Sequence, residues 1–296
     1  MKKAFHYGGQ AVMEGVMMRG RKTAATVVRR PNGELATDVK TLSSIYTGWL
    51  RKTPFFRGII VLIEAMILGI GSLFYSANIA LEEEGENISG TPTWLILLFS
   101  FGLSVSLFFI APLFLTRLLD PYIESSLLFH LIEGAIRLVI FLVFLKLIGL
   151  MSDVKRTFSY HGAEHKTINA YENGIPLEVK AVQQYSTAHA RCGTSFLLAV
   201  LVIAVIVFAL VGRHAVWLMV LSRVLLIPII AAIGYEVTQF GARHMKNIVA
   251  RAVMAPGMWL QSLSTREPDD DQVEVAIAAL KKVLAVDVDE AEAAAP

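Results

Sequence analysis

The stretch from Thr194 to Gly212 reads TSFLLAVLVIAVIVFALVG and contains no charged residue. An α-helix rises 1.5 Å per residue, so about 20 apolar residues cross the roughly 30 Å hydrocarbon core of a bilayer. An apolar run near this length is typical of a membrane-spanning helix. The stretch therefore predicts an integral membrane protein.

The composition of the whole chain supports this prediction. The 296 residues are 55% hydrophobic and only 18% charged, whereas soluble domains carry about 25% charged residues. Three further apolar runs approach bilayer length: Thr93–Thr116, Leu127–Leu150 and Ala215 to about Tyr235. Pro228 predicts a kink in the last of these. We therefore expect an α-helical polytopic membrane protein with about four transmembrane helices.

A further apolar run, Ile59–Ala80, is interrupted by polar residues. Glu64, Gly71, Tyr75 and Asn78 fall on one helical face. An ionisable residue inside a bilayer is costly unless it faces protein or water. We expect this run to form an amphipathic helix embedded in the membrane rather than a fifth span. Residues 55–240 would then form the membrane domain.

The N-terminal segment, residues 1–54, predicts a small cytosolic β-rich piece. Ala24–Arg30 and Glu34–Lys40 flank Pro31-Asn32-Gly33, and Asn-Gly is a strong hairpin signal. The preceding glycines resemble a phosphate-binding loop, but Arg21 interrupts the required Gly-Lys pair. We expect turns there, with the methionines packed against the membrane or a partner.

The C-terminal segment, residues 241–296, predicts a cytosolic tail with an amphipathic helix. Asp269-Asp270-Asp271 after Pro268 are typical of a helix start. An apolar stripe follows, which we expect to pack against the same chain: Val273, Ile277, Leu280 and Leu284. The acidic, alanine-rich end, Asp287–Pro296, predicts disorder.

The distribution of Lys and Arg indicates the orientation. Residues 1–58 contain eleven, residues 151–193 five and residues 241–268 four, while the connections 117–126 and 213–214 contain one each. Cytoplasmic loops of membrane proteins are enriched in these cations. If Ile59–Ala80 does not span, both termini and residues 151–193 lie in the cytosol. We expect the protein to be a multi-pass protein of the cell inner membrane.

Between two apolar runs lies YHGAEHKTINAYENG, Tyr160–Gly174, which predicts a short helix ended by Asn173-Gly174. His161, Glu164 and His165 share one face of such a helix. Two imidazoles one turn apart can bind one metal ion, and H-x-x-E-H is the inverted form of the zinc-protease motif. We expect a divalent metal, with zinc favoured, and Glu164 as a catalytic base. The alternative is a solvated helix whose histidines only bond to nearby loops.

A catalytic metal needs about one more protein ligand. The candidates are Glu164, Glu172, His189, Cys192 and Glu236. His189 and Cys192, the one cysteine, would share a helical face where the run from Thr194 begins. Glu236 lies where the last span reaches the same membrane surface, although it could instead pair with Arg243. Glu133 and Arg137 are four residues apart and can also form an ion pair.

Four stretches carry a resemblance to a known family. They are GGQAVMEGVMMRG at Gly8–Gly20, YHGAEHKT at Tyr160–Thr167, HARCGTS at His189–Ser195 and TREPDD at Thr265–Asp270. Together they resemble the YqhQ-like family of bacterial membrane proteins, over nearly the whole chain. The resemblance implies a metal-dependent enzyme in a bacterial membrane and leaves the reaction open.

Three functions fit these observations. The favoured one is a membrane-embedded metal-dependent hydrolase that acts on a lipid or a membrane-protein segment at the cytosolic surface. The second is a scaffold or assembly factor for membrane proteins, with a structural metal. A transporter is the third, although no inverted repeat is visible. No nucleic-acid partner is expected, and the oligomeric state is left open.

Overall fold

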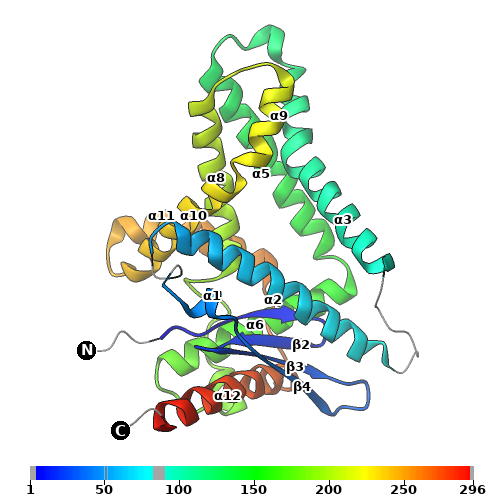
Figure 1. Cartoon of the computed structure of the whole chain (residues 1–296), viewed down its shortest axis with the longest axis vertical. Coiled ribbons are helices and arrows are strands. Elements are labelled where there is room, and N and C mark those ends of the chain that lie inside the picture. The colour runs from blue at the N-terminus through cyan, green and yellow to red at the C-terminus, as the bar shows by residue number, and fades with distance from the viewer. Residues whose placement is uncertain (1–4, 50, 52, 83–90, 294–296) are drawn as a thin grey trace.

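The computed structural model describes residues 5–49, 51, 53–82 and 91–293 (Figure 1). Upright apolar helices form one part of the molecule, and a small sheet flanked by helices forms the other. The strands are β1 (Gly8–Val12), β2 (Gly15–Arg19), β3 (Thr23–Arg29) and β4 (Leu35–Thr41). The helices are α1 (Ser44–Thr47), α2 (Phe56–Ala80), α3 (Thr91–Val105), η3 (Ser106–Ile110), α4 (Ala111–Arg117), η4 (Asp120–Tyr122), α5 (Ser126–Ile148), α6 (Ser152–Glu172), α7 (Val179–Val182), α8 (Gly193–Val211), α9 (Val216–Leu225), α10 (Ile227–Arg243), α11 (Ile248–Ser264) and α12 (Asp270–Ala293).

The four strands form one antiparallel sheet in the order β1-β2-β3-β4. The predicted hairpin is confirmed as β3 and β4, which pair from Thr23 with Thr41 to Arg29 with Leu35. The sequence did not predict β1 and β2, where only turns were expected. Strand β2 is buried on both faces, so its apolar residues do not alternate with polar ones and give no strand pattern.

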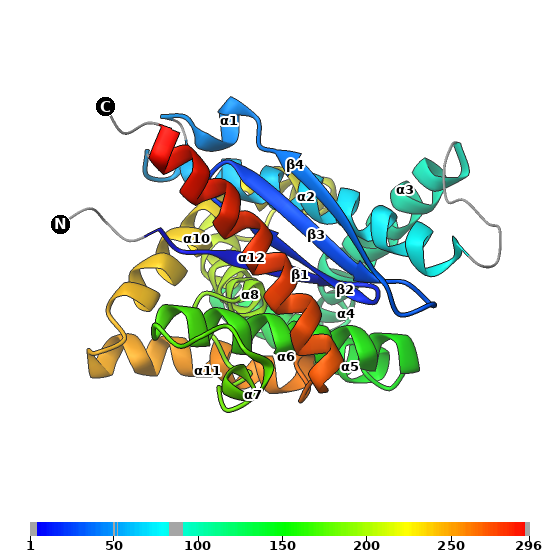
Figure 2. The ribbon, with the colours of Figure 1, turned by 90° about the horizontal axis from the view of Figure 1, so that it is seen from below.

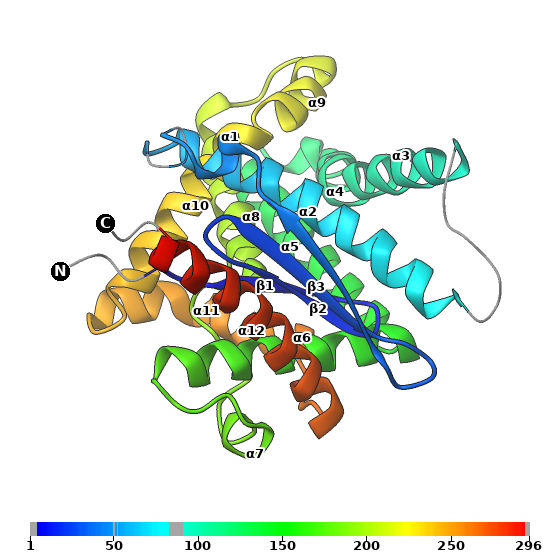
Figure 3. The same cartoon turned by 60° about the horizontal axis from the view of Figure 1, so that its bottom comes forward.

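Helices cover both faces of the sheet (Figures 2 and 3). Val16 and Met18 of β2 pack in a core with α6 and α12, whereas Met17 packs towards Leu68 of α2. Met17 and Met18 therefore lie inside the protein, and the prediction that they contact the membrane or a partner is wrong for these two residues. The sheet is what brings the N-terminus, the motif helix α6 and the C-terminal helix α12 together.

Helix α12 confirms the predicted stripe but not the predicted disorder. Val273, Ile277 and Leu280 are buried against the sheet and α6. The helix continues to Ala293, although disorder was expected for Asp287–Pro296, of which residues 294–296 lie outside the described part of the chain. Asp287 itself is buried and accepts a hydrogen bond from the hydroxyl of Tyr7 at 2.8 Å. Alanine is the best helix former, so an acidic, alanine-rich segment can extend a docked helix.

Several helices are long and apolar enough to span a membrane. Phe56–Ala80, Trp94–Arg117 and Gly193–Val211 each qualify within the described part of the chain. Two bent pairs, α5 with α6 at 100° and α9 with α10 at 47°, would raise the number to five. The second bend confirms the break expected at Pro228. Helix α6 is polar and packs on the sheet, outside the apolar segments.

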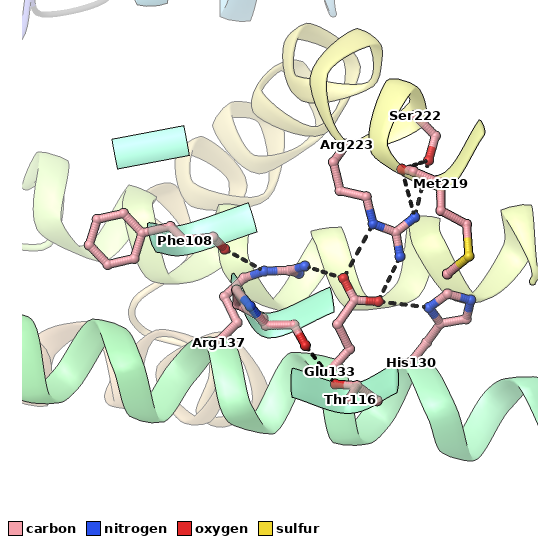
Figure 4. Close-up of polar contacts among 9 residues, drawn as sticks. Phe108, Thr116, His130, Glu133, Arg137, Met219, Ser222 and Arg223 are labelled. Atoms are coloured by element: carbon pink, nitrogen blue, oxygen red, sulfur yellow. Dashed lines mark hydrogen bonds and ion pairs between the residues drawn. The ribbon is translucent and has the colours of Figure 1, made fainter. Parts of the chain in front are cut away.

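A buried ion network connects three of the upright helices (Figure 4). Glu133 of α5 accepts hydrogen bonds from Arg137 and from Arg223 of α9, each at 2.6 Å. His130 Nδ1 lies 3.1 Å from the same carboxylate, and Arg137 also donates to the carbonyl of Phe108 in η3. The four ionisable side chains are at most 1% exposed. The predicted pair of Glu133 and Arg137 is thus confirmed, and Arg223 joins it.

Candidate metal centre

His161, His165 and Cys192 come together between α6 and the start of α8. Each offers one ligand atom, and these three atoms lie within 4.8 Å of one another. The Nε2 atom of His161 lies 3.3 Å from Cys192 Sγ. Two imidazole nitrogens and a sulfur are donors typical of a zinc site. The geometry therefore matches the core of the predicted ligand set.

Both imidazoles are oriented by main-chain carbonyls. His161 Nδ1 lies 2.9 Å from the carbonyl oxygen of Ser264, and His165 Nδ1 lies 2.5 Å from that of Thr187. A carbonyl can only accept, so each Nδ1 carries the proton and each Nε2 keeps its lone pair. Metal-binding histidines typically have such a second partner, which fixes the tautomer and the ring orientation. Burial lowers the pKa of His165, which also favours the neutral ring.

Gly162 allows α6 to approach the chain that follows α11. A Cβ atom at this position would lie only 2.0 Å from the carbonyl oxygen of Arg266. Any other residue would push α6 away from this segment and from the carbonyl of Ser264 that orients His161. The glycine in the motif therefore serves the placement of the neighbouring imidazole.

Cys192 is the N-cap residue of α8. Its sulfur accepts a hydrogen bond from the backbone N–H of Thr194 at 3.3 Å. The sulfur therefore lies at the N-terminus of α8, beside the two imidazoles. The expectation that Cys192 and His189 share a helical face is wrong, because His189 lies in the loop before α8.

His189 lies beside the three clustered side chains. Its ring centroid is 5.7 Å from that of His165, and its Nε2 is 3.5 Å from a carboxylate oxygen of Glu172. Burial raises the pKa of Glu172, but hydrogen bonds from His189 and Arg191 outweigh this and lower it to about 2. Glu172 therefore acts here as a charged partner of His189 and Arg191.

Glu164 is buried next to the cluster. The backbone N–H of Gly9 in β1 donates to its Oε1 at 3.0 Å. A Cβ atom on Gly9 would lie 2.5 Å from the carbonyl oxygen of Met17 and 3.1 Å from Glu164 Cδ, so only glycine fits. Burial raises the pKa of Glu164, an effect that His161 and the Gly9 N–H partly offset. The glycine-rich N-terminal stretch thus places a donor on the motif carboxylate.

Glu236, another candidate ligand, lies away from the cluster. It forms an ion pair with Arg57 and accepts a hydrogen bond from the backbone N–H of Phe55 at 3.1 Å. Arg57, rather than the expected Arg243, is its ion-pair partner. Glu236 therefore connects α10 to the start of α2.

Several residues that hold the site together were not found from the sequence. The side chain of Gln261 in α11 bonds to both the N–H and the carbonyl of His189, at 2.9 and 2.8 Å. Asn169 donates to the carbonyls of Ser186 and Ala188 and so holds the same loop in place. Gln261 is distant in sequence and has no motif of its own. Asn169 lies within the motif Tyr160–Gly174, so the sequence did offer a signal for this residue.

A cavity of about 290 Å³ lies over the cluster. Its lining includes the three clustered side chains together with His189, Glu164 and Gly9. Three cationic side chains, Arg19, Arg51 and Arg191, also line it. The candidate centre is therefore accessible to a small polar group rather than closed by packing.

The fold and the cluster define a class of helical protein that combines apolar helices with a candidate His-His-Cys metal centre. The chain belongs to the family described as "Protein of unknown function (DUF1385)", whose model matches residues 53–286. It is 37% identical over 295 residues to the "Uncharacterized protein YqhQ" of Bacillus subtilis (strain 168), covering 94% of this chain and 92% of that protein. The resemblance to the YqhQ-like family is thereby confirmed. No solved structure matches the chain.

Proposed function

We propose that this protein is a membrane-embedded, metal-dependent hydrolase that acts at the cytosolic surface of the bacterial inner membrane. The observation that supports this best is the paired orientation of His161 and His165. Each ring is held at Nδ1 by a carbonyl, and their ligand atoms converge with Cys192 Sγ. A solvated helix whose histidines bond only to loops would not need a thiol at the same point.

The donor set fits zinc. Two neutral imidazoles and one thiolate are three ligands, the number that a catalytic zinc site takes from protein while one position stays open. Bound zinc would lower the pKa of water and polarise a carbonyl or phosphoryl oxygen. In the proposed reaction Glu164, whose carboxylate lines the cavity, takes a proton from the attacking water and gives it to the leaving group. The N–H of Gly9 keeps that carboxylate in position.

Charge and packing support the proposed membrane orientation. Helix α2 packs along the sheet through Leu68 and through a hydrogen bond of Ser72 with Thr26. This packing supports an embedded helix rather than a span. Both termini and α6 would then lie on the side with most of the Lys and Arg residues, which is the cytosol.

Metal analysis of the purified full chain tests the proposal. We expect about one zinc per chain for the wild type, and loss of that zinc in the His161→Ala/His165→Ala double variant. The matched control is His244→Ala, because His244 is exposed and bonds to the carbonyl of Phe240 in its own helix. Equal and negligible zinc in the wild type and the double variant would refute the metal centre.

His189 supports a second candidate function, a scaffold with a structural metal. If this ring supplies a fourth ligand, the site is closed and no substrate can reach the ion. The spectrum of the Co²⁺-substituted protein separates the two. An open site changes its spectrum when azide is added, and this change is expected; an unchanged spectrum would favour the scaffold.

A further inference from the structure

A second cavity adjoins the one over the metal centre. It has a volume of about 180 Å³, compared with about 290 Å³ for the first. The two cavities share six lining residues: Val61, Arg191, Cys192, Gly193, Tyr235 and Gln239. A molecule bound at the metal centre can therefore extend into the second cavity.

The second cavity is apolar where the first is polar. Its remaining lining residues are Leu62 and Ala65 of α2, Phe196 of α8 and Thr238 of α10. Helices α2 and α8 are each apolar enough to span a membrane, and α10 belongs to one of the bent pairs. Ala65 is exposed, so this end of the cavity is open between apolar helices. A hydrocarbon chain fits this environment better than a polar one.

The residues that line the polar cavity include three arginines, Arg19, Arg51 and Arg191, and one carboxylate, that of Glu164. Arg19 and Arg51 both pair with the single carboxylate of Glu64. Burial, and then repulsion from Arg19, lowers the pKa of Arg51 to about 10. An added anion would relieve this crowding of like charges.

Arg191 lies where the two cavities meet and carries one donor without a partner among the described residues. Its guanidinium pairs with Glu172 through Nη2, and its Nε is buried without a hydrogen-bond partner among the described residues. A buried donor without a partner is costly, so an acceptor at this point would be favourable. Arg191 lines both cavities and would lie at the junction of a polar head and its chain.

We infer that the substrate is an anionic amphiphile, a lipid whose phosphate or carboxylate head binds over the His161–His165–Cys192 cluster and whose hydrocarbon chain enters the cavity between α2, α8 and α10. This inference rests on the proposed function, because it names the substrate class of the same site. It favours a lipid over a membrane-protein segment, since a peptide bond carries no net charge to match the cationic groups.

Calorimetry with alkyl phosphates tests the inference. The full chain in lipid nanodiscs is titrated with ethyl, butyl and hexyl phosphate, and empty nanodiscs provide the blank. Each methylene that enters the apolar cavity should tighten binding about fourfold. Ala65→Trp, which fills the cavity, should flatten this rise. Met66→Trp, on the exposed face of the same helix, should keep it.

Two further ligands identify the head group. If hexanoate binds more tightly than hexyl phosphate, the head group is a carboxylate. If hexyl phosphate binds more tightly, the head group is a phosphate. Arg191→Gln should weaken all the anionic ligands by about tenfold or more. Neutral hexanamide that binds as tightly as the anions would overturn the inference and favour a peptide substrate.

The outcomes separate this inference from the proposed function. Equal affinity of the wild type for every chain length, with zinc still bound, refutes the amphiphile and leaves the metal centre intact. A chain-length dependence without any bound zinc refutes the metal centre and leaves the lipid cavity. The wild-type series by itself decides between these outcomes, so the test does not depend on whether Ala65→Trp folds.

Discussion

Two clusters of largely buried ionisable side chains in the described part of the chain differ in how their partners are arranged. In the network around Glu133, two guanidiniums and an imidazole converge on one carboxylate inside the apolar helices (Figure 4). In the cluster around His161, His165 and Cys192, the rings use one nitrogen for the fold and present the other beside a cavity. The difference supports a structural role for the first cluster and the ligand-binding role that we propose for the second.

The largest expected effect is that of Glu133→Ala on stability. The substitution leaves Arg137 and Arg223 buried without their shared carboxylate, and breaking such a network typically costs about 3–5 kcal/mol. Unfolding of the full chain in mild detergent measures this change. The zinc content of the protein that remains folded should match the wild type. Leu131→Ala, on the exposed face of α5, is the control, and a loss no larger than that control would contradict a structural role.

Gln261→Ala should lower both the stability of the protein and its affinity for zinc. The loss of its side chain leaves the N–H and the carbonyl of His189 without partners. This should lower the free energy of unfolding by about 1–3 kcal/mol. It also releases the loop next to the cluster, so zinc affinity should fall about 10- to 100-fold. Competition with a chelator measures the affinity.

Ser262→Ala is the matched control for this variant. Ser262 is exposed on the same helix and bonds only to the carbonyl of Trp259. If both variants bind zinc like the wild type, the loop does not support the centre.

Asn247→Ala separates stability from metal binding. Asn247 caps α11, the helix that carries Gln261, by accepting from the N–H of Val249 at 2.8 Å. Loss of an N-cap typically costs about 1 kcal/mol, and glycine at the same position costs only a few tenths. We expect this order in unfolding measurements, with unchanged zinc affinity. A tenfold loss of affinity here would show that the site responds to any loosening of α11.

The smallest effect is expected for Glu236→Gln. The pair of Glu236 with Arg57 is about one-fifth exposed on each side, and pairs near the surface contribute about 0.2–1 kcal/mol. Zinc content should not change, because Glu236 lies outside the cluster. Loss of zinc in this variant would return Glu236 to the ligand set.

The sequence predicted the parts of the fold that depend on local patterns. Thr194–Gly212 became α8, the Asn-Gly turn became the β3–β4 hairpin, and the stripe from Val273 became the packed face of α12. Strand β2 was missed because burial on both faces removes the alternation that marks a strand. Strand β1 was missed because it begins with two glycines, which are depleted in strands.

The site could be predicted only in part. His161, His165 and Cys192 are residue types with metal-binding chemistry, so their motif and spacing could be recognised. Glu236 has the same chemistry, but its partner Arg57 lies in a helix far away in sequence, and no pattern reports that contact. Gln261 was missed for the same reason: it acts on His189 only through tertiary structure.

The acceptors behind the two imidazoles are peptide oxygens, at Ser264 and Thr187. A peptide oxygen is present whatever side chain the residue carries, so mutation of either codon leaves the acceptor in place. The tautomers of His161 and His165 are thus specified by the path of the backbone. A substitution at either position would change the side chain without changing which ring nitrogen is available to bind a ligand.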